Sequence, residues 1–591
     1  MLKEVAELGK ICSEDFLTHI FTPSMINKAR SGKVKLKLIA IEFDENGNYI
    51  KPSLEDYDEN NYRKYYHREG ATKGPNCSPA CIITDVKKSF NGKIKGWFSA
   101  YGSEDSLLSK IKVEIDKKMD KIISDISRLK EEYSGSKDFF ALVIKVDGKH
   151  IGELDKFRNV INKIYETRMK EHKSKRKAKG ARGICMVCNK SDIDVYPVSV
   201  SNAFSFSTIE KKGFLTNFSE EDAWKNISVC LDCGKNISKG KNFLDNYLNF
   251  QLYGQIKFYI IPKFVIGVID SHVLREIEKI RSGENKDEGA IKHLVGEDDL
   301  YAPFLRENDA MSLIYLFYEK QQKKMRILGI SEEVYPSRLK KLFESMESSI
   351  DYFIFKEDFL KKIFGKKFEG HRGFKSLAKE FIKFFPLNSN ECGSYEQNFV
   401  DIINSILSDR KIDKNILVSQ FMKFIRNDFE NQGNSNSRGV WIGRTLDAIK
   451  IFKFLNSLRL IGNMGCGDKM ANMLDIEEKK VSFLVGVYVA KLLNEQYKLR
   501  DSTPFVKKLY GLNLNEERIK ELFKEAYNKL LEYDKEHFYS WLSQKISEYF
   551  VKIKDRWQLT DDEISFCFTC GLALGKALNE DEIEKILRGE F

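Results

Sequence analysis

The sequence predicts an α+β multidomain protein, in which an N-terminal α/β domain carrying a four-cysteine module is followed by an all-α C-terminal bundle. Three observations predict this class. The chain has 591 residues, which is too long for one ordinary hydrophobic core. Strand-like alternation recurs before Pro336 and almost vanishes after it, where apolar residues repeat at helical spacing. Two pairs of closely spaced cysteines lie between residues 183 and 245.

The first 182 residues combine strand and helix patterns. Residues 34–43 alternate along the chain and run into Asn46-Gly47, a pair typical of hairpin turns. Residues 105–133 carry apolar side chains at helical spacing, and residues 139–146 form a second strand-like run. We therefore expect an α/β part over residues 1–182.

The middle of the chain predicts further strands. Residues 256–265 are strand-like, with an interruption expected at Pro262. Residues 313–318 and 325–330 predict a hairpin joined by a charged turn.

The last part of the chain predicts a helical bundle. Apolar faces in residues 481–492, 519–530 and 538–550 predict three helices, the second capped by Asn515. Thr560 with Glu563 forms a capping box that opens a fourth helix. The predicted division of the chain is 1–182 (N-terminal α/β part), 183–245 (four-cysteine module), 246–350 (remainder of the α/β domain), 351–469 (helical region) and 470–591 (C-terminal bundle).

No apolar run is long enough to cross a bilayer. The best candidate, residues 483–493, is too short and is expected to belong to an amphipathic helix. The first residues lack the pattern of a secretory signal, and we expect a cytoplasmic protein. Eleven cysteines in such a chain argue against a disulfide framework.

Positive charge is concentrated just before the cysteines. The net charge is +11, and residues 163–182 hold nine Lys or Arg and two Glu. Clustered cations attract phosphate through counterion release, and a solvated helix face is the alternative. The candidates for phosphate contact are Lys173, Lys175, Arg176, Lys177 and Lys179.

The sharpest local motif is a pair of Cys-x-x-Cys knuckles. Cys185 and Cys188 form the first, and Cys230 and Cys233 form the second. Four thiolates that converge in this way predict one structural Zn²⁺ per chain, because a closed four-sulfur site leaves no coordination position for catalysis. Buried unpaired cysteines or a redox pair are the alternatives. Gly234 is expected to serve a tight turn after the second knuckle.

Other motifs give no evidence of catalysis. Cys567 and Cys570 lie in an apolar helical run without a second pair, so helix packing explains them better than a metal does. Gly296-Glu297-Asp298-Asp299 lacks the second glycine of a palm cyclase, and its flanks do not alternate as strands, which favours a solvated acidic loop. No phosphate-binding loop or serine elbow is present, so the sequence predicts a binding protein and not an enzyme.

The features around the knuckles follow a fixed order. A basic segment precedes the first knuckle, and an aromatic segment and Lys211-Lys212-Gly213-Phe214 follow it. Gly240-Lys241 follows the second knuckle, and then come a strand with Ile261-Pro262, a hairpin closed by residues 335–338, and a helical half. This order resembles that of the Cas-eight family, b subtype, the large subunit of the type I-B CRISPR Cascade.

The resemblance implies a non-catalytic, antiviral role in a complex guided by CRISPR RNA. Such a subunit lies near the 5′ handle of that RNA, beside the backbone subunits of the complex. It recognises the protospacer-adjacent motif in target double-stranded DNA, aids unwinding and R-loop formation, and helps to recruit the separate helicase–nuclease.

Two segments are candidates for contact with nucleic acid on this reading. Residues 67–78 combine glycines with Arg68, Lys73, Asn76 and Ser78, which suits groove or phosphate contact, although an ordinary surface loop is the alternative. Lys211 and Lys212 are candidates for backbone contact.

The resemblance also implies that the C-terminal region could be made separately, as small subunits, from an internal start. Met470 is the predicted start, because Gly467-Asp468 can encode a ribosome-binding core at suitable spacing. The alternative is that these codons only encode a loop that leads into a helix. Two alternatives remain for the whole chain: a degenerate palm cyclase or nuclease subunit of a type III-like complex, and a free-standing zinc-containing nucleic-acid-binding protein.

Overall fold

The computed structural model separates the chain into two compact units, Met1–Asn246 and Tyr247–Phe591. The fold is mixed α+β with several domains, as predicted. The residues that the structure describes are 1–11, 36–58, 61–65, 78–133, 138–172, 176–177, 180–201, 203–204, 212–264, 274–275, 311–321, 324–365, 373–374, 376–387, 395–431, 439–462, 473–553 and 556–589.

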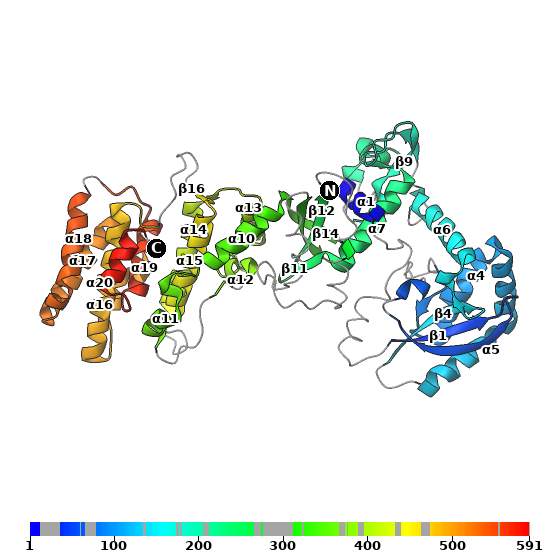
Figure 1. Ribbon diagram of the computed structural model, residues 1–591, viewed down its shortest axis with the longest axis horizontal. Coiled ribbons are helices and arrows are strands. Elements are labelled where there is room, and N and C mark those ends of the chain that lie inside the picture. The colour runs from blue at the N-terminus through cyan, green and yellow to red at the C-terminus, as the bar shows by residue number, and fades with distance from the viewer. Residues whose placement is uncertain are drawn as a thin grey trace. The chain divides into compact units, whose positions relative to one another are not determined.

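The first unit contains a sheet built around β1 (Leu36–Phe43). This strand pairs antiparallel with β2 (Tyr49–Asp56) and parallel with β4 (Phe139–Val146), which in turn pairs with the short β3 (Cys81–Ile82) and β5 (Lys149–His150). Gly47 adopts φ +85°, so the predicted hairpin turn between β1 and β2 is confirmed. Figure 1 shows β1 beside β4.

Helices connect these strands. The chain between β3 and β4 forms α3 (Val86–Ser89), a π-helical turn (Phe90–Lys95), α4 (Gly96–Tyr101) and the long α5 (Ser106–Tyr133). Helix α5 packs against β2 with an apolar face that includes Leu108, Ile115 and Ile122. Helix α6 (Asp155–Lys170) then leaves the sheet, and a two-strand pair follows, β6 (Glu171–His172) with β7 (Arg176–Lys177).

The cysteines belong to a small second sheet of the first unit. Strands β8 (Ala181–Gly183), β9 (Ile193–Pro197) and β10 (Ser228–Val229) pair antiparallel with β9 in the middle. Helix α7 (Leu231–Tyr247) starts directly after β10, and the N-terminal helix α1 (Leu2–Ile11) packs on α7. Figure 1 shows these two helices side by side.

The second unit begins with a four-stranded antiparallel sheet in chain order, β11 (Asn249–Tyr253), β12 (Ile256–Phe264), β13 (Met311–Gln321) and β14 (Lys324–Val334). The hairpin β13–β14 confirms the prediction. The expected interruption at Pro262 is wrong, because Pro262 pairs with Leu313 inside β12. The Ile260 N–H donates to the Leu248 carbonyl on the β11 side. Pro262 faces the same side two residues later, beyond Asn249, the first residue of β11. Its missing N–H therefore breaks no ladder bond.

Helices follow this sheet. They are α10 (Pro336–Ser348), α11 (Glu357–Phe364), α12 (Leu377–Phe381), α13 (Tyr395–Leu407), α14 (Lys414–Glu430) and α15 (Val440–Ser457), with a short parallel pair β15 (Ile412–Asp413) and β16 (Ile461–Gly462). Helix α13 covers β14, and α14 packs on α15.

Five helices occupy the described residues after Met473. They are α16 (Glu477–Arg500), α17 (Glu516–Glu532), α18 (Ser540–Lys552), α19 (Asp561–Leu574) and α20 (Glu580–Leu587). The Asn515 cap and the Thr560–Glu563 capping box form as predicted. The sequence predicts an amphipathic helix here, and this expectation is wrong for α16. Every residue from Val481 to Ala490 is buried, because α17, α18 and α19 all pack against this helix.

Two glycines let α16 and α19 approach closely. A Cβ on Gly486 would lie 2.1 Å from the Phe568 carbonyl oxygen, and one on Gly571 would lie 2.0 Å from that of Phe483. Among the described helices, none is long and apolar enough to span a bilayer.

Candidate functional site: a four-cysteine metal centre and possible nucleic-acid contacts

The first knuckle is a hydrogen-bonded turn between β8 and β9. The Cys185 N–H donates to the Lys190 carbonyl (3.0 Å), and the Asn189 N–H donates to the Cys185 carbonyl (2.8 Å). Asn189 adopts φ +58°, a left-handed conformation that asparagine tolerates well. This turn places the Cys185 sulfur, which is buried, beside that of Cys188.

The second knuckle is the start of a helix. Cys230 immediately precedes α7, Cys233 lies in its first turn, and the Gly234 N–H donates to the Cys230 carbonyl (2.9 Å). The turn expected at Gly234 is therefore wrong, since this glycine is a buried helical residue. Sheet pairing joins the knuckles: the Met186 N–H donates to the Ser228 carbonyl (2.9 Å).

The four cysteines converge as a metal site requires. Their sulfur atoms all lie within 4.8 Å of one another. A tetrahedral zinc–thiolate site, with Zn–S bonds of about 2.3 Å, has sulfur–sulfur edges of about 3.8 Å. Small shifts therefore bring the cluster onto one ion, and the cluster could bind a metal. The other group of possible ligands in the described part of the chain, Asp534, Glu536 and His537, lies at largely exposed positions.

The environment of Cys185 favours a thiolate. Burial acts to raise the pKa of Cys185, but N–H donation from Cys188, Cys230 and Val187 outweighs it and lowers the pKa to about 7. The Cys230 N–H lies 3.3 Å from the Cys185 sulfur. Burial raises the pKa of Cys230 and Cys233, so these thiols hold their protons until a cation replaces them.

Helix α7, which carries Cys233, is held by an N-terminal helix that sequence analysis did not connect with it. A Cβ on Gly9 would lie 1.9 Å from the Asn236 carbonyl oxygen, and one on Gly240 would lie 1.9 Å from that of Val5. Backbones this close require glycine on both helices. The glycine at position 240 was visible in the sequence, but nothing there indicated that residues 2–11 would contact it.

The structure describes few of the residues predicted to contact nucleic acid. Arg176 and Lys177 form β7, paired with β6, so these two lie on a short strand pair and not on a helix face. Lys212 is exposed at the start of a 3₁₀ turn. The Ser78 side chain is fully buried in the free chain, and its contact with nucleic acid stays a prediction. Arg68, Lys73, Asn76, Lys173, Lys175, Lys179 and Lys211 lie outside the described residues.

Comparison with known protein families decides what the chain is related to. The N-terminal domain of CRISPR-associated protein TM1802 matches residues 1–163, its central domain matches residues 182–334, and its C-terminal domain matches residues 376–585. The chain belongs to this CRISPR-associated family. None of the curated proteins matches the chain.

Membership of the TM1802 family implies a role in a CRISPR complex with nucleic-acid partners. The family's central domain contains all four cysteines and also strands β11–β14. The cysteine cluster therefore lies within the matched range.

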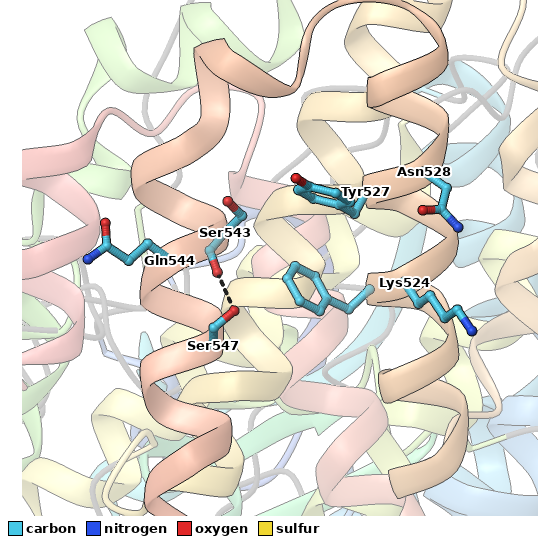
Figure 2. A pocket seen from close by; sticks show the side chains of 7 residues that line it. Lys524, Tyr527, Asn528, Ser543, Gln544 and Ser547 are labelled. Atoms are coloured by element: carbon cyan, nitrogen blue, oxygen red, sulfur yellow. Dashed lines mark hydrogen bonds between the residues drawn. The ribbon is translucent and has the colours of Figure 1, made fainter.

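One pocket described by the structure lies between α17 and α18. It has a volume of about 430 Å³, and Figure 2 shows Tyr527 pointing from α17 toward α18, where the Ser547 hydroxyl donates to the Ser543 carbonyl (2.9 Å). The remaining lining residues are Phe523, Lys524, Asn528 and Gln544. This lining holds no carboxylate, histidine or thiol.

The third cysteine pair, Cys567 and Cys570, packs inside a helix, as expected. Cys567 and Cys570 are buried in α19, and burial raises the pKa of Cys567 to about 12. The acidic motif Gly296–Asp299 lies outside the described residues.

Proposed function

We propose that this chain is the non-catalytic large subunit of a type I-B CRISPR RNA-guided surveillance complex, the Cascade. It binds near the 5′ handle of the CRISPR RNA, recognises the protospacer-adjacent motif in target DNA, aids R-loop formation and helps to recruit the helicase–nuclease. The observation that carries the proposal is the match of three TM1802 domains in order along the chain.

The metal in this proposal is a structural Zn²⁺. Four sulfur donors suit zinc, which has no redox chemistry of its own and prefers tetrahedral thiolate sites. The cluster joins the β8–β10 sheet to α7, so the ion would hold these elements together. Because all four positions are filled by protein, the zinc takes no part in a reaction.

Residues 67–78 are the proposed motif-reading segment. The chain on both sides of it is fixed to one core: Tyr65 and Ala80 are buried in the same cluster as Leu38 and Val143 of the sheet. Within this segment, Lys73 and Asn76 are the residues proposed to contact base edges.

The basic segment before the cysteines is the proposed site of phosphate contact. Replacing Lys173, Lys175, Arg176, Lys177 and Lys179 together with Gln should weaken binding to all sequences and flatten its salt dependence. A salt slope equal to that of the wild type would contradict this assignment.

Co-expression with the neighbouring genes tests the function. The purified chain should carry a short, uniform CRISPR RNA together with the backbone subunits. In that complex, Lys73→Ala and Asn76→Ala should reduce discrimination between targets with and without the correct adjacent motif, whereas Lys51→Ala, on an exposed position of β2, should not.

Two results would overturn this function. Purification without RNA or subunits favours a free-standing nucleic-acid-binding protein. Metal-dependent nucleotide polymerisation that is lost in Asp298→Ala favours the cyclase alternative.

A further inference from the structure

Two phenylalanines project from the segment between the cysteine knuckles. Phe214 is 76% exposed and Phe218 is 73% exposed, more than any other phenylalanine in the described residues. They end two consecutive 3₁₀ turns, Lys212–Phe214 and Thr216–Phe218. Single exposed apolar residues are common, but a pair of strongly exposed aromatic rings four residues apart is not.

The loop that carries the rings is braced by one asparagine. The Asn226 side-chain oxygen accepts from both the Thr216 N–H (2.9 Å) and the Thr216 hydroxyl (2.6 Å). Its amide nitrogen donates to the Phe214 carbonyl (2.6 Å). Between the two phenylalanines, Leu215 turns inward and is buried with Ala223. The rings are therefore held outward by a fixed backbone.

The backbone at the second ring is strained. Asn217 and Phe218 both adopt left-handed conformations, with φ +55° and +54°. Asparagine tolerates this region, but a bulky residue such as phenylalanine is an outlier there. The Asn217 amide donates to Asp222 (2.9 Å) and helps to hold the turn. Strain that surrounding contacts maintain is a feature of binding elements, because it keeps a side chain where a partner needs it.

The charge around the rings indicates what they bind. Over residues 210–226 the sequence holds four acidic residues, Glu210, Glu220, Glu221 and Asp222, and three lysines, Lys211, Lys212 and Lys225. Lys225 pairs with Asp222 at 2.6 Å. Acidic groups outnumber basic ones here, so the loop lacks the positive surplus that contact with a phosphate backbone requires. An apolar pocket with a basic rim is the complementary surface.

We propose that Phe214 and Phe218 dock this chain onto another protein subunit of its complex, one that presents an apolar pocket bordered by lysine or arginine. The inference rests on the proposed role within a CRISPR complex and adds the partner surface. Docking also depends on the metal site, because Asn226 lies two residues before Ser228. The Ser228 hydroxyl donates to the Ile184 carbonyl, and the Ser228 carbonyl accepts from the Met186 N–H, so these bonds hold the chain on either side of Cys185.

The test uses the full chain with the subunits encoded by its neighbouring genes and CRISPR RNA. The double variant Phe214→Ala/Phe218→Ala should weaken association with those subunits at least about tenfold. Zinc content, melting temperature and nucleic-acid binding of the isolated chain should stay as in the wild type. Phe538→Ala is the matched control, because Phe538 is also a strongly exposed phenylalanine but lies in the second unit.

A second variant separates binding from folding. Phe218→Asn removes the ring and places a residue that favours the left-handed region at φ +54°. The isolated chain should melt at the same or a higher temperature, yet assemble more weakly. Loss of binding without loss of folding is what a docking role requires.

Three results overturn the docking role, and they are distinct. If the wild type and both variants assemble equally, docking is wrong and the proposed function stands. If the variants lose nucleic-acid binding in the isolated chain instead, the rings stack on bases. If the wild type binds neither subunits nor CRISPR RNA, the proposed function fails and docking fails with it.

Discussion

Single residues set the chemistry of the cysteine cluster through the backbone around them. The Cys185 sulfur accepts hydrogen bonds from backbone N–H groups of its own knuckle and of Cys230, whereas Cys233 lies in the first turn of α7. The cluster thus depends on a turn, a strand pair and a helix start at once. Loss of any one sulfur would leave three of the four donors that the proposed closed zinc site requires.

Cys185→Ser and Cys230→Ser should each abolish stoichiometric zinc and unfold the module. Metal binding contributes on the order of 10 kcal/mol to such small modules. Zinc is measured by elemental analysis, and folding by limited proteolysis. Cys567→Ala, at a buried position in α19, is the control and should keep one zinc per chain. Wild-type protein without zinc, or full zinc in both serine variants, would refute the metal assignment.

Lys453 offers a pH-dependent measurement at the residue scale. Burial lowers the pKa of Lys453 to about 8 from 10.5, and its Nζ lies 4.0 Å from the centre of the Tyr352 ring. Between pH 8 and pH 10.5, Lys453 is protonated in the unfolded chain and neutral in the folded chain. Stability should therefore rise with pH across this window, and below pH 8 the folded chain bears a constant cost.

Lys453→Met should melt higher than the wild type at pH 7. This advantage should shrink as the pH passes 8 and approaches 10.5, as followed by thermal unfolding in a pH series. Lys340→Met, at an exposed position of α10, should show no such trend. An advantage that is independent of pH would mean that packing, and not charge burial, accounts for it.

At the scale of elements, the contact between α1 and α7 determines how the metal module is supported. Val5, Ala6 and Leu8 are buried along α1, and Gly9 meets α7 backbone to backbone. Two short helices gain little stability on their own, so the stability of this pair comes from packing.

Gly240→Ala should destabilise the first unit by about 1–3 kcal/mol or more, because its new methyl group meets the Val5 carbonyl oxygen at 1.9 Å. Chemical denaturation monitored in the first unit measures the change. Gly213→Ala is the matched control, since a Cβ there would meet nothing within 4 Å. Equal stability of both variants would mean that α1 does not hold α7 in solution.

At the scale of the whole molecule, the C-terminal helices are not separate from those before them. Helix α19 packs against α14 and α15 as well as α16. The Phe566 ring lies 5.8 Å from that of Phe421, and Arg426 pairs with Asp562 at 2.7 Å. Glu563 pairs with Lys414, and both side chains are nearly buried. A product that starts at Met470 would therefore expose one face of α19.

A fragment of residues 470–591 should melt lower and less cooperatively than residues 395–591, which retain α13, α14 and α15. Each large apolar side chain that loses its cover costs about 1.5–3 kcal/mol. Circular dichroism and calorimetry of the two fragments measure this. Equal melting temperatures would show that the five last helices form an independent fold, as a separately made small subunit requires.

Local features of this protein were determined by the sequence alone. Hairpin turns, helix caps and cysteine spacing act over a few residues, so Asn46-Gly47, the Thr560–Glu563 box and the knuckles were predictable without knowledge of the rest of the chain.

The tertiary structure decided what depends on distant partners. Pro262 fits inside a strand because β11 begins only at Asn249, opposite Tyr259. Residues 481–490 of α16 are buried on all sides because three helices pack against them. Phe218 is exposed because Asn226 braces its loop. Such contacts join residues far apart in the chain, and no local pattern encodes which of them will meet.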